Sequence, residues 1–159
     1  MLFRSTSLGS DVSHPLLLPG KSTGKPLTLI ITSDRGLCGP YNGGVLRTFT
    51  QLVRENPALK GGEIEVVGKK GQGFLRFGGY QIARHHTQFG DKPTYASVKD
   101  LASEYIARFI SGEISSVRVI YMKFLSVGRQ KPTVMQLLPF QRSEEHTSEL
   151  QSPCNLVCR

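Results

Sequence analysis

The sequence lacks any long run of apolar residues. The longest apolar run near the N-terminus is Leu16–Leu18, and it lies between Pro15 and Pro19. A transmembrane helix needs about 20 predominantly apolar residues, and a signal peptide needs an apolar segment of roughly 7 to 15. We therefore expect no membrane-spanning segment, no direct insertion into a membrane and no secretory signal.

Cysteine is also scarce. The chain has three cysteines, Cys38, Cys154 and Cys158, an odd number without the paired spacing of a disulfide framework. Secreted domains of this size that depend on disulfides carry even sets of cysteines at regular spacings. The composition predicts a reducing compartment.

Acidic residues are fewer than basic ones, but the basic residues form no long run. The 20 Lys and Arg residues against 12 Asp and Glu residues give a formal net charge of +8. The basic residues are scattered, and only Lys69 and Lys70 are adjacent lysines, so nothing resembles a nucleic-acid-binding arm. We expect no nucleic-acid partner. The charge alone leaves an acidic protein partner or an anionic membrane surface open.

Three regions differ in composition. Residues 1–25 hold Ser, Thr, Gly and Pro without apolar periodicity, which predicts a leader or loop segment. Residues 26–140 carry the regular patterns and form the expected α/β domain. Residues 141–159 have no apolar face and resemble the conceptual translation of a sequencing adapter, so we interpret them as a non-native tail.

Within residues 26–140 the apolar patterns alternate between those of strands and those of helices. A continuous apolar and β-branched run predicts a central strand at 27–32. Further strands are predicted at 63–67, 116–125 and 133–138, with a turn at 126–132 joining the last two. Apolar stripes predict helices at 45–53, 69–77 and 98–110, with Asn42 as the N-cap of the first, and weaker strand character indicates a short edge strand within 80–88. The order predicts an open, mostly parallel α/β sheet in a Rossmann-like three-layer arrangement, with an antiparallel hairpin at one edge.

A glycine-rich turn, residues 32–44, follows the first strand. Turns at this place in open α/β sheets bind phosphates at a helix N-terminus. However, the glycine spacing matches neither G-x-G-x-x-G nor G-x-x-x-x-G-K-[ST], and the turn contains no lysine. A small nucleotide-binding module stays as an alternative, and no cofactor site is assigned.

Cys38, which lies in this turn, is the candidate nucleophile of the chain. With His85 or His86 as a base it would make a Cys-dependent α/β enzyme, the second alternative. The simpler interpretation is that Cys38 is a small buried side chain and that the tandem histidines are solvated in a polar loop. We therefore assign no catalytic residue.

Two further sets of polar residues have ordinary structural interpretations. Asp34 and Arg35 follow the first strand, where we expect them to cap the loop and pair with neighbours. The histidines lack the spacing of metal ligands, so no metal site is assigned. They are His14, His85, His86 and His146.

The segment Leu29–Gly39 resembles, almost residue for residue, a segment of the gamma subunits of rotary F-type ATP synthases. Other stretches similar to the family are His14–Leu16, Val67–Gly71, Ile120–Phe124, Gln130, Pro132 and Leu137–Pro139, so the resemblance spans about His14 to Phe140. The departures are Pro40, where the family usually has glycine, and Met122, where it usually has Asn.

This resemblance implies a noncatalytic subunit of the central stalk, the rotor that turns inside a ring of alpha and beta subunits. It implies an α/β domain at the foot of the stalk, near the epsilon subunit and the membrane c-ring. It also implies a peripheral location on the cytoplasmic side of the bacterial inner membrane, or on the equivalent matrix or stromal face. Torque passes through a coiled coil of N- and C-terminal helices in the family. No heptad pattern flanks residues 14–140, so we expect the chain to be a fragment without those helices.

Overall fold

The structure, a computed structural model, describes residues 16–17, 23–90 and 92–140. Most of the expected leader and the whole expected tail lie outside these residues, as do His14, His146, Cys154 and Cys158. The described part contains one five-stranded sheet with the strand order β3-β2-β1-β4-β5. None of its helices is long and apolar enough to cross a membrane.

Strand β1 (Lys25–Ile31) lies at the centre of the sheet, as its continuous apolar sequence predicts. It pairs in parallel with β2 (Glu63–Val67) on one side and β4 (Ile114–Ser126) on the other. The short strand β3 (Arg84–His86) extends the parallel part at one edge. Strand β5 (Arg129–Leu138) pairs antiparallel with β4 at the other. The predicted mostly parallel sheet with an edge hairpin is confirmed.

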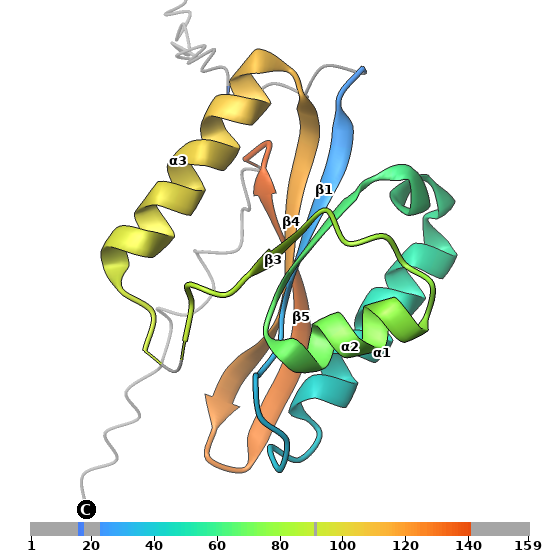
Figure 1. Cartoon of the computed structure of the whole chain (residues 1–159), viewed down its shortest axis with the longest axis vertical. Coiled ribbons are helices and arrows are strands. Elements are labelled where there is room, and N and C mark those ends of the chain that lie inside the picture. The colour runs from blue at the N-terminus through green and yellow to red at the C-terminus, as the bar shows by residue number, and fades with distance from the viewer. Residues whose placement is uncertain (1–15, 18–22, 91, 141–159) are drawn as a thin grey trace, which may run out of the picture.

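Helices cover both faces of the sheet (Figure 1). On one face α1 (Tyr41–Glu55), the 3₁₀ helix η1 (Pro57–Gly61) and α2 (Lys69–Phe77) bury an apolar core that includes Ile30 and Phe49. On the other face α3 (Tyr95–Ser111) covers a second core. The arrangement is the predicted three layers, and η1 is an addition to the predicted order.

The first helix begins earlier than predicted. Pro40 occupies the N-cap position without a side-chain hydrogen bond, and Asn42 lies inside the first turn, so the prediction of Asn42 as N-cap is wrong. The reason is that the Asn42 side chain bonds to Ser33, across the loop that precedes the helix. Tertiary contacts have replaced the local cap.

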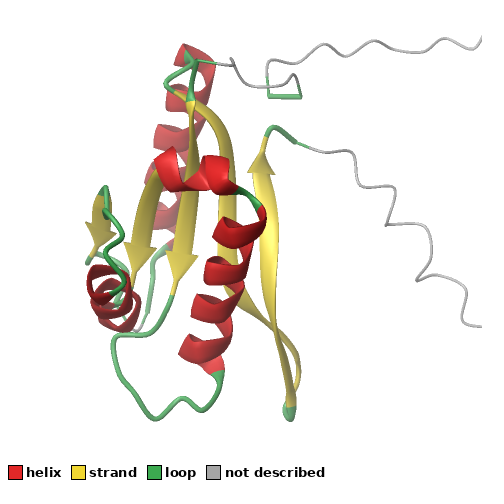
Figure 2. Ribbon diagram, turned by 90° about the vertical axis from the view of Figure 1, so that its right-hand side faces the viewer, coloured by secondary structure: helices red, strands yellow, loops and turns green. Residues whose placement is uncertain are grey.

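The other boundaries differ from prediction mainly in length. Helix α3 starts at Tyr95 because Thr94 caps it, the Thr94 side chain accepting a hydrogen bond from the Ser97 N–H. It ends at Gly112, whose φ of 86° is in the left-handed region that favours glycine. The expected turn at 126–132 is shorter, because β4 runs to Ser126 and β5 begins at Arg129. Figure 2 shows the resulting hairpin as a long ribbon beside α1.

Candidate functional site

The glycine-rich turn after β1 is held by side-chain hydrogen bonds rather than left open. The Ser33 N–H donates to Asn42 Oδ1 at 3.0 Å, and Asn42 Nδ2 donates to Cys38 Sγ at 3.1 Å. At the tip, Leu37 has a φ of 63° and its side chain is fully exposed. The turn therefore has a fixed conformation that presents an apolar side chain to its surroundings.

Cys38 is partly exposed, and its neighbours do not supply a base. Its sulfur lies 3.6 Å from Ser33 Oγ and accepts the hydrogen bond from Asn42. Neither a hydroxyl nor an amide takes a proton from a thiol near neutral pH. The polar contacts of Cys38 are thus structural, and they do not support the Cys-dependent enzyme. The expectation that Cys38 is a small buried side chain is wrong, because Cys38 is only partly buried.

The beginning of α2 approaches the same edge of the sheet, but protein groups already fill it. Asp34 Oδ1 accepts the Lys69 N–H at 3.0 Å, and Thr32 Oγ1 accepts the Gly71 N–H at 2.9 Å. These are the donors that a phosphate would use at a helix N-terminus. Asp34 therefore has the expected capping role, and these two N–H groups at the start of α2 already have protein acceptors.

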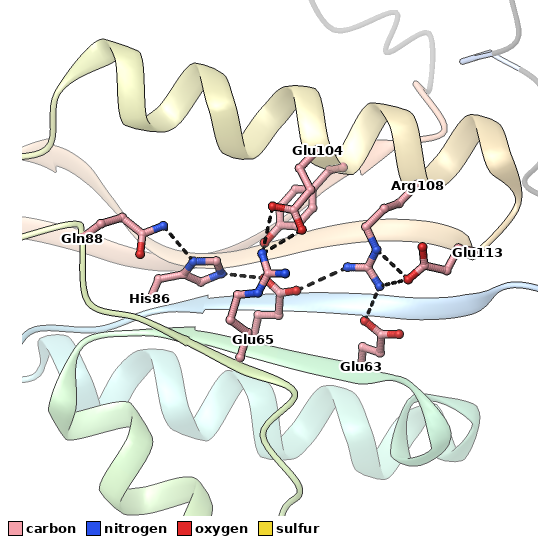
Figure 3. A network of polar contacts seen from close by, with 9 residues as sticks. Glu63, Glu65, His86, Gln88, Glu104, Arg108 and Glu113 are labelled. Carbon is pink, nitrogen blue, oxygen red and sulfur yellow. Dashed lines mark hydrogen bonds and ion pairs between the residues drawn. The ribbon is translucent and has the colours of Figure 1, made fainter.

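A buried polar network lies on the other face of the sheet, between α3 and strands β2 and β3 (Figure 3). At its centre is Glu65, which is 1% exposed. Its Oε2 atom lies 2.6 Å from His86 Nε2 and accepts the Tyr105 hydroxyl at 2.6 Å. Gln88 Nε2 lies 3.2 Å from His86 Nδ1, so both ring nitrogens have partners. The three elements are joined through one carboxylate.

The expectation that both tandem histidines are solvated is wrong, because His86 is 2% exposed and His85 is half-buried with its Nε2 atom out of contact with solvent. His86 pairs with Val67 on the neighbouring strand, and its side chain enters the seam beneath α3, where it contacts Glu65 two residues earlier on β2. The sequence did carry a signal for this network. Glu65 lies within a buried strand, and a carboxylate in such a place requires a hydrogen-bonding partner.

Arg108 continues the network toward the amino ends of the strands. Its guanidinium donates to Glu113 Oε1 at 2.8 Å and to Glu63 Oε2 at 2.6 Å, and it lies 3.5 Å from Glu65 Oε1. The hydrogen bond with Glu113, followed by that with Glu63, raises the pKa of Arg108 above its ordinary value. The same contact with Arg108 lowers the pKa of Glu113. Both groups are held in their charged forms.

Two other groups complete the seam. Arg84 donates to both carboxylate oxygens of Glu104, at 2.7 and 2.8 Å, near the solvent. Burial, together with the hydrogen bond to Glu65, raises the pKa of Tyr105 well above its ordinary value of 10.0, so Tyr105 stays a donor. The network thus extends from the Arg84–Glu104 ion pair near the solvent to the buried carboxylate of Glu65.

A histidine, a carboxylate and a tyrosine in contact are groups that can move protons in an active site. Here the central pair is closed off from substrate, since His86 and Glu65 are 2% and 1% exposed. Among the described residues, no group of three His, Cys, Asp or Glu side chains could hold a metal ion. The network is a brace between α3 and the sheet, not a reaction centre.

Comparison with known proteins decides the family. A family model described as "ATP synthase" matches residues 2–156. The chain belongs to the ATP synthase gamma-chain family. The matched range takes in part of the region expected to be a foreign tail, and the origin of that tail stays a prediction.

Bacterial gamma chains are among the proteins similar to this chain. It is 37% identical over 145 residues to the ATP synthase gamma chain of Pelotomaculum thermopropionicum, covering 91% of this chain and 50% of the relative. It is also 37% identical over 139 residues to that of Desulfitobacterium hafniense, covering 86% and 47%. The chain spans about half the length of the curated relatives it matches.

Solved structures of the same family share the fold. A chain from the rotor of the Euglena gracilis mitochondrial ATP synthase matches with a TM-score of 0.57 and 20% identity, covering 74% of this chain and 40% of the other. A chain from the central stalk and c-ring structure of the Tetrahymena thermophila enzyme matches with a TM-score of 0.56 and 22% identity, covering 72% and 50%. At these identities the likeness shows the fold alone.

Proposed function

We propose that this chain is the α/β portion of a noncatalytic central-stalk subunit of an F-type ATP synthase. The observation that carries the proposal is the family match across residues 2–156. The segment Leu29–Gly39, which resembles the family most, covers the end of the central strand β1 and the first part of the hydrogen-bonded turn that follows it. The role of such a subunit is to couple proton flow through the membrane ring to ATP synthesis in the catalytic head.

The partners in this proposal are the alpha and beta subunits of the head, an epsilon subunit and the membrane c-ring. The net charge of +8 favours acidic surfaces on those partners. The proposed location is peripheral to the membrane as part of the complex, on the cytoplasmic side in a bacterium or on the matrix or stromal side in an organelle.

The noncatalytic role is supported by the turn after β1. The turn has no P-loop lysine. The backbone N–H groups of Lys69 and Gly71, at the start of α2, donate to the side chains of Asp34 and Thr32. We expect no catalytic, cofactor or metal residue, and we expect the purified chain, free of ATPase contamination, to hydrolyse no ATP.

A chimaeric complex tests the proposal. Residues 26–140 would replace the matching segment of the Pelotomaculum gamma chain, and the chimaera would be expressed with the other subunits of that ATP synthase. We expect the chimaera to copurify with a tagged beta subunit and with epsilon. A control chimaera with Leu27→Asp, which puts a charge at a wholly buried position, should fail to copurify. Loss of the unmodified chimaera from an otherwise assembled complex would argue against a stalk role.

A further inference from the structure

The outward face of α2 combines positive charges with two exposed aromatic rings. Gly71 and Leu75 are the buried residues of this helix and hold its other side against the sheet. Phe77 is 96% exposed and Phe74 is 41% exposed. Since they lie three residues apart on one helix, the two rings form a patch rather than the isolated exposed apolar residue that is common on protein surfaces.

We call the exposed residues of this helix the α2 surface. They are Lys69, Lys70, Gly73, Phe74, Arg76 and Phe77.

The charge of the α2 surface is of one sign. Residues 66–90 of the sequence contain no aspartate or glutamate. In the part of the chain that the structure describes, no residue forms an ion pair or a side-chain hydrogen bond with the side chains of Lys69, Lys70 or Arg76. Asp34 contacts the N-terminal end of the helix, but its Oδ1 atom is bonded to the Lys69 backbone N–H, at 3.0 Å. The three cations therefore give this surface a positive potential that a partner can meet.

Gly73 lies at the centre of the α2 surface. At about 100° per residue, it points directly away from the side of the helix that Gly71 and Leu75 bury. A Cβ added at Gly73 would meet no atom within 4 Å. Without a side chain at this position, the backbone of another protein segment can approach α2 closely between the cations and the rings.

These features favour a protein partner over a lipid surface. Basic segments that bind anionic lipids carry clusters of about four to eight Lys or Arg residues, more than the three found here. Phenylalanine and arginine are enriched in the cores of protein interfaces. The open glycine position also suits a backbone, since small residues are the points at which two helices approach most closely.

We propose that the α2 surface is a docking site for an acidic, amphipathic helix of a protein partner. Apolar side chains of that helix pack over Gly73 and against Phe74 and Phe77. Carboxylates beside them pair with the cations of the α2 surface. The proposal is carried by the residues of α2 and does not rest on the stalk role.

The test is a titration of a dye-labelled helical peptide with the purified 159-residue chain, followed by fluorescence anisotropy. The peptide has about 20 residues, long enough to be helical in water, with one stripe of leucine flanked by glutamate and with alanine elsewhere. We expect saturable binding that weakens as salt is raised, because screening reduces the attraction between the charges. The same peptide with glutamine in place of glutamate should bind much more weakly.

Matched variants localise the site. Phe77→Ser should raise the Kd at least about fivefold, as removal of a central interface aromatic does. Tyr95→Ser, at an aromatic residue that is 83% exposed at the start of α3, should change the Kd less than about twofold. Helix α3 covers the opposite face of the sheet (Figure 1), so this control lies away from α2.

Two further variants test the charge and the close approach. Lys69→Gln should weaken binding, whereas Lys99→Gln, at an exposed lysine of α3, should not. Gly73→Glu puts a carboxylate at the centre of the α2 surface, where there is room for it, and should abolish binding of the acidic peptide. Thermal melts verify that each variant folds.

Absence of saturation, equal binding of the glutamate and glutamine peptides, or equal effects of Phe77→Ser and Tyr95→Ser would overturn the proposal. So would binding to vesicles that contain phosphatidylglycerol, sensitive to Phe77→Ser, without binding to the peptide. None of these readouts depends on assembly into an ATP synthase. A negative result would therefore leave the proposed stalk role standing, and failure of the chimaera would leave the binding result standing.

Discussion

Glu65 Oε2 and His86 Nε2 lie 2.6 Å apart on neighbouring parallel strands, with side chains that are 2% and 0% exposed. The same carboxylate oxygen accepts the Tyr105 hydroxyl from α3. One buried contact point therefore joins β2, β3 and the helix above them. The other polar contacts between α3 and this edge, Arg84 with Glu104 and Arg108 with Glu63, are more exposed, so we expect the stability of the seam to depend mainly on the buried side chains.

Removing the central carboxylate should be costly. Glu65→Leu leaves His86 and the Tyr105 hydroxyl buried without their partner, so we expect the free energy of unfolding to fall by about 3 to 5 kcal/mol. His86→Leu should lower the free energy of unfolding less, by about 1 to 3 kcal/mol, because Glu65 retains its contacts with Tyr105 and Arg108. The double variant should be less destabilised than the sum. Urea unfolding of all four proteins measures the coupling, and strict additivity would contradict the network.

The raised pKa of Tyr105 makes stability sensitive to alkaline pH. Folding favours the protonated phenol, so this contribution is complete below the ordinary pKa of 10.0 and is lost as the pH rises beyond it. Each pH unit above 10.0 should lower the free energy of unfolding by up to about 1.4 kcal/mol.

The Tyr105→Phe variant isolates this effect. It should be less stable at pH 7 by about 1.5 to 3 kcal/mol, through loss of a hydrogen bond to a charged group. It should also lose less stability than the wild type between pH 10 and 12. Denaturant unfolding across that range measures both slopes, and parallel curves would mean that Tyr105 ionises as freely in the folded chain as in the unfolded one.

Two glycines on α2 should respond in opposite ways to alanine. A Cβ on Gly71 would lie 2.6 Å from Thr32 Oγ1 and 2.8 Å from Val66 Cγ2, so Gly71→Ala should destabilise by about 1 to 3 kcal/mol. A Cβ on Gly73 meets nothing within 4 Å, so Gly73→Ala should stabilise by about 0.5 to 1 kcal/mol. Thermal and urea midpoints of both variants test the close packing of α2 against Thr32 and β2. Equal shifts of the two midpoints would contradict that packing.

Asp34 should contribute to stability by capping α2. Asp34→Ala removes the acceptor for the Lys69 N–H and should cost about 1 kcal/mol. Asp100→Ala, an exposed carboxylate within α3, is the control and should change stability by no more than about 0.5 kcal/mol. Urea unfolding compares them. If Asp34→Ala changed stability as little as Asp100→Ala, water would be an adequate acceptor for the Lys69 N–H in place of Asp34, and the capping role would be wrong.

The apolar patterns were sufficient to predict the sheet. The continuous apolar run at 27–32 placed β1 in the interior, because a strand that is buried on both faces has few positions for polar side chains. The stripe in 98–110 predicted α3 for a similar reason. The start of α1 could not be found locally, since Asn42 is used across the loop by Ser33.

The buried network depends on distances that the sequence does not give. Glu65 and Tyr105 are 40 residues apart, and their contact exists only once α3 has crossed the sheet. The tandem histidines have the composition of a solvated loop, and their burial follows from the pairing of β3 with β2. Local composition predicts elements well, but it does not predict which polar groups those elements bring together.

The most direct test of the stalk assignment is ATP-driven proton pumping by membrane vesicles that contain the chimaeric gamma chain with residues 26–140 of this protein. Pumping requires the domain to connect the catalytic head to the membrane ring, which assembly alone does not demonstrate. We predict a proton gradient that forms on addition of ATP and collapses with an uncoupler, at a substantial fraction of the level reached with the unmodified gamma chain. An assembled chimaeric complex that hydrolyses ATP without pumping protons would contradict the account.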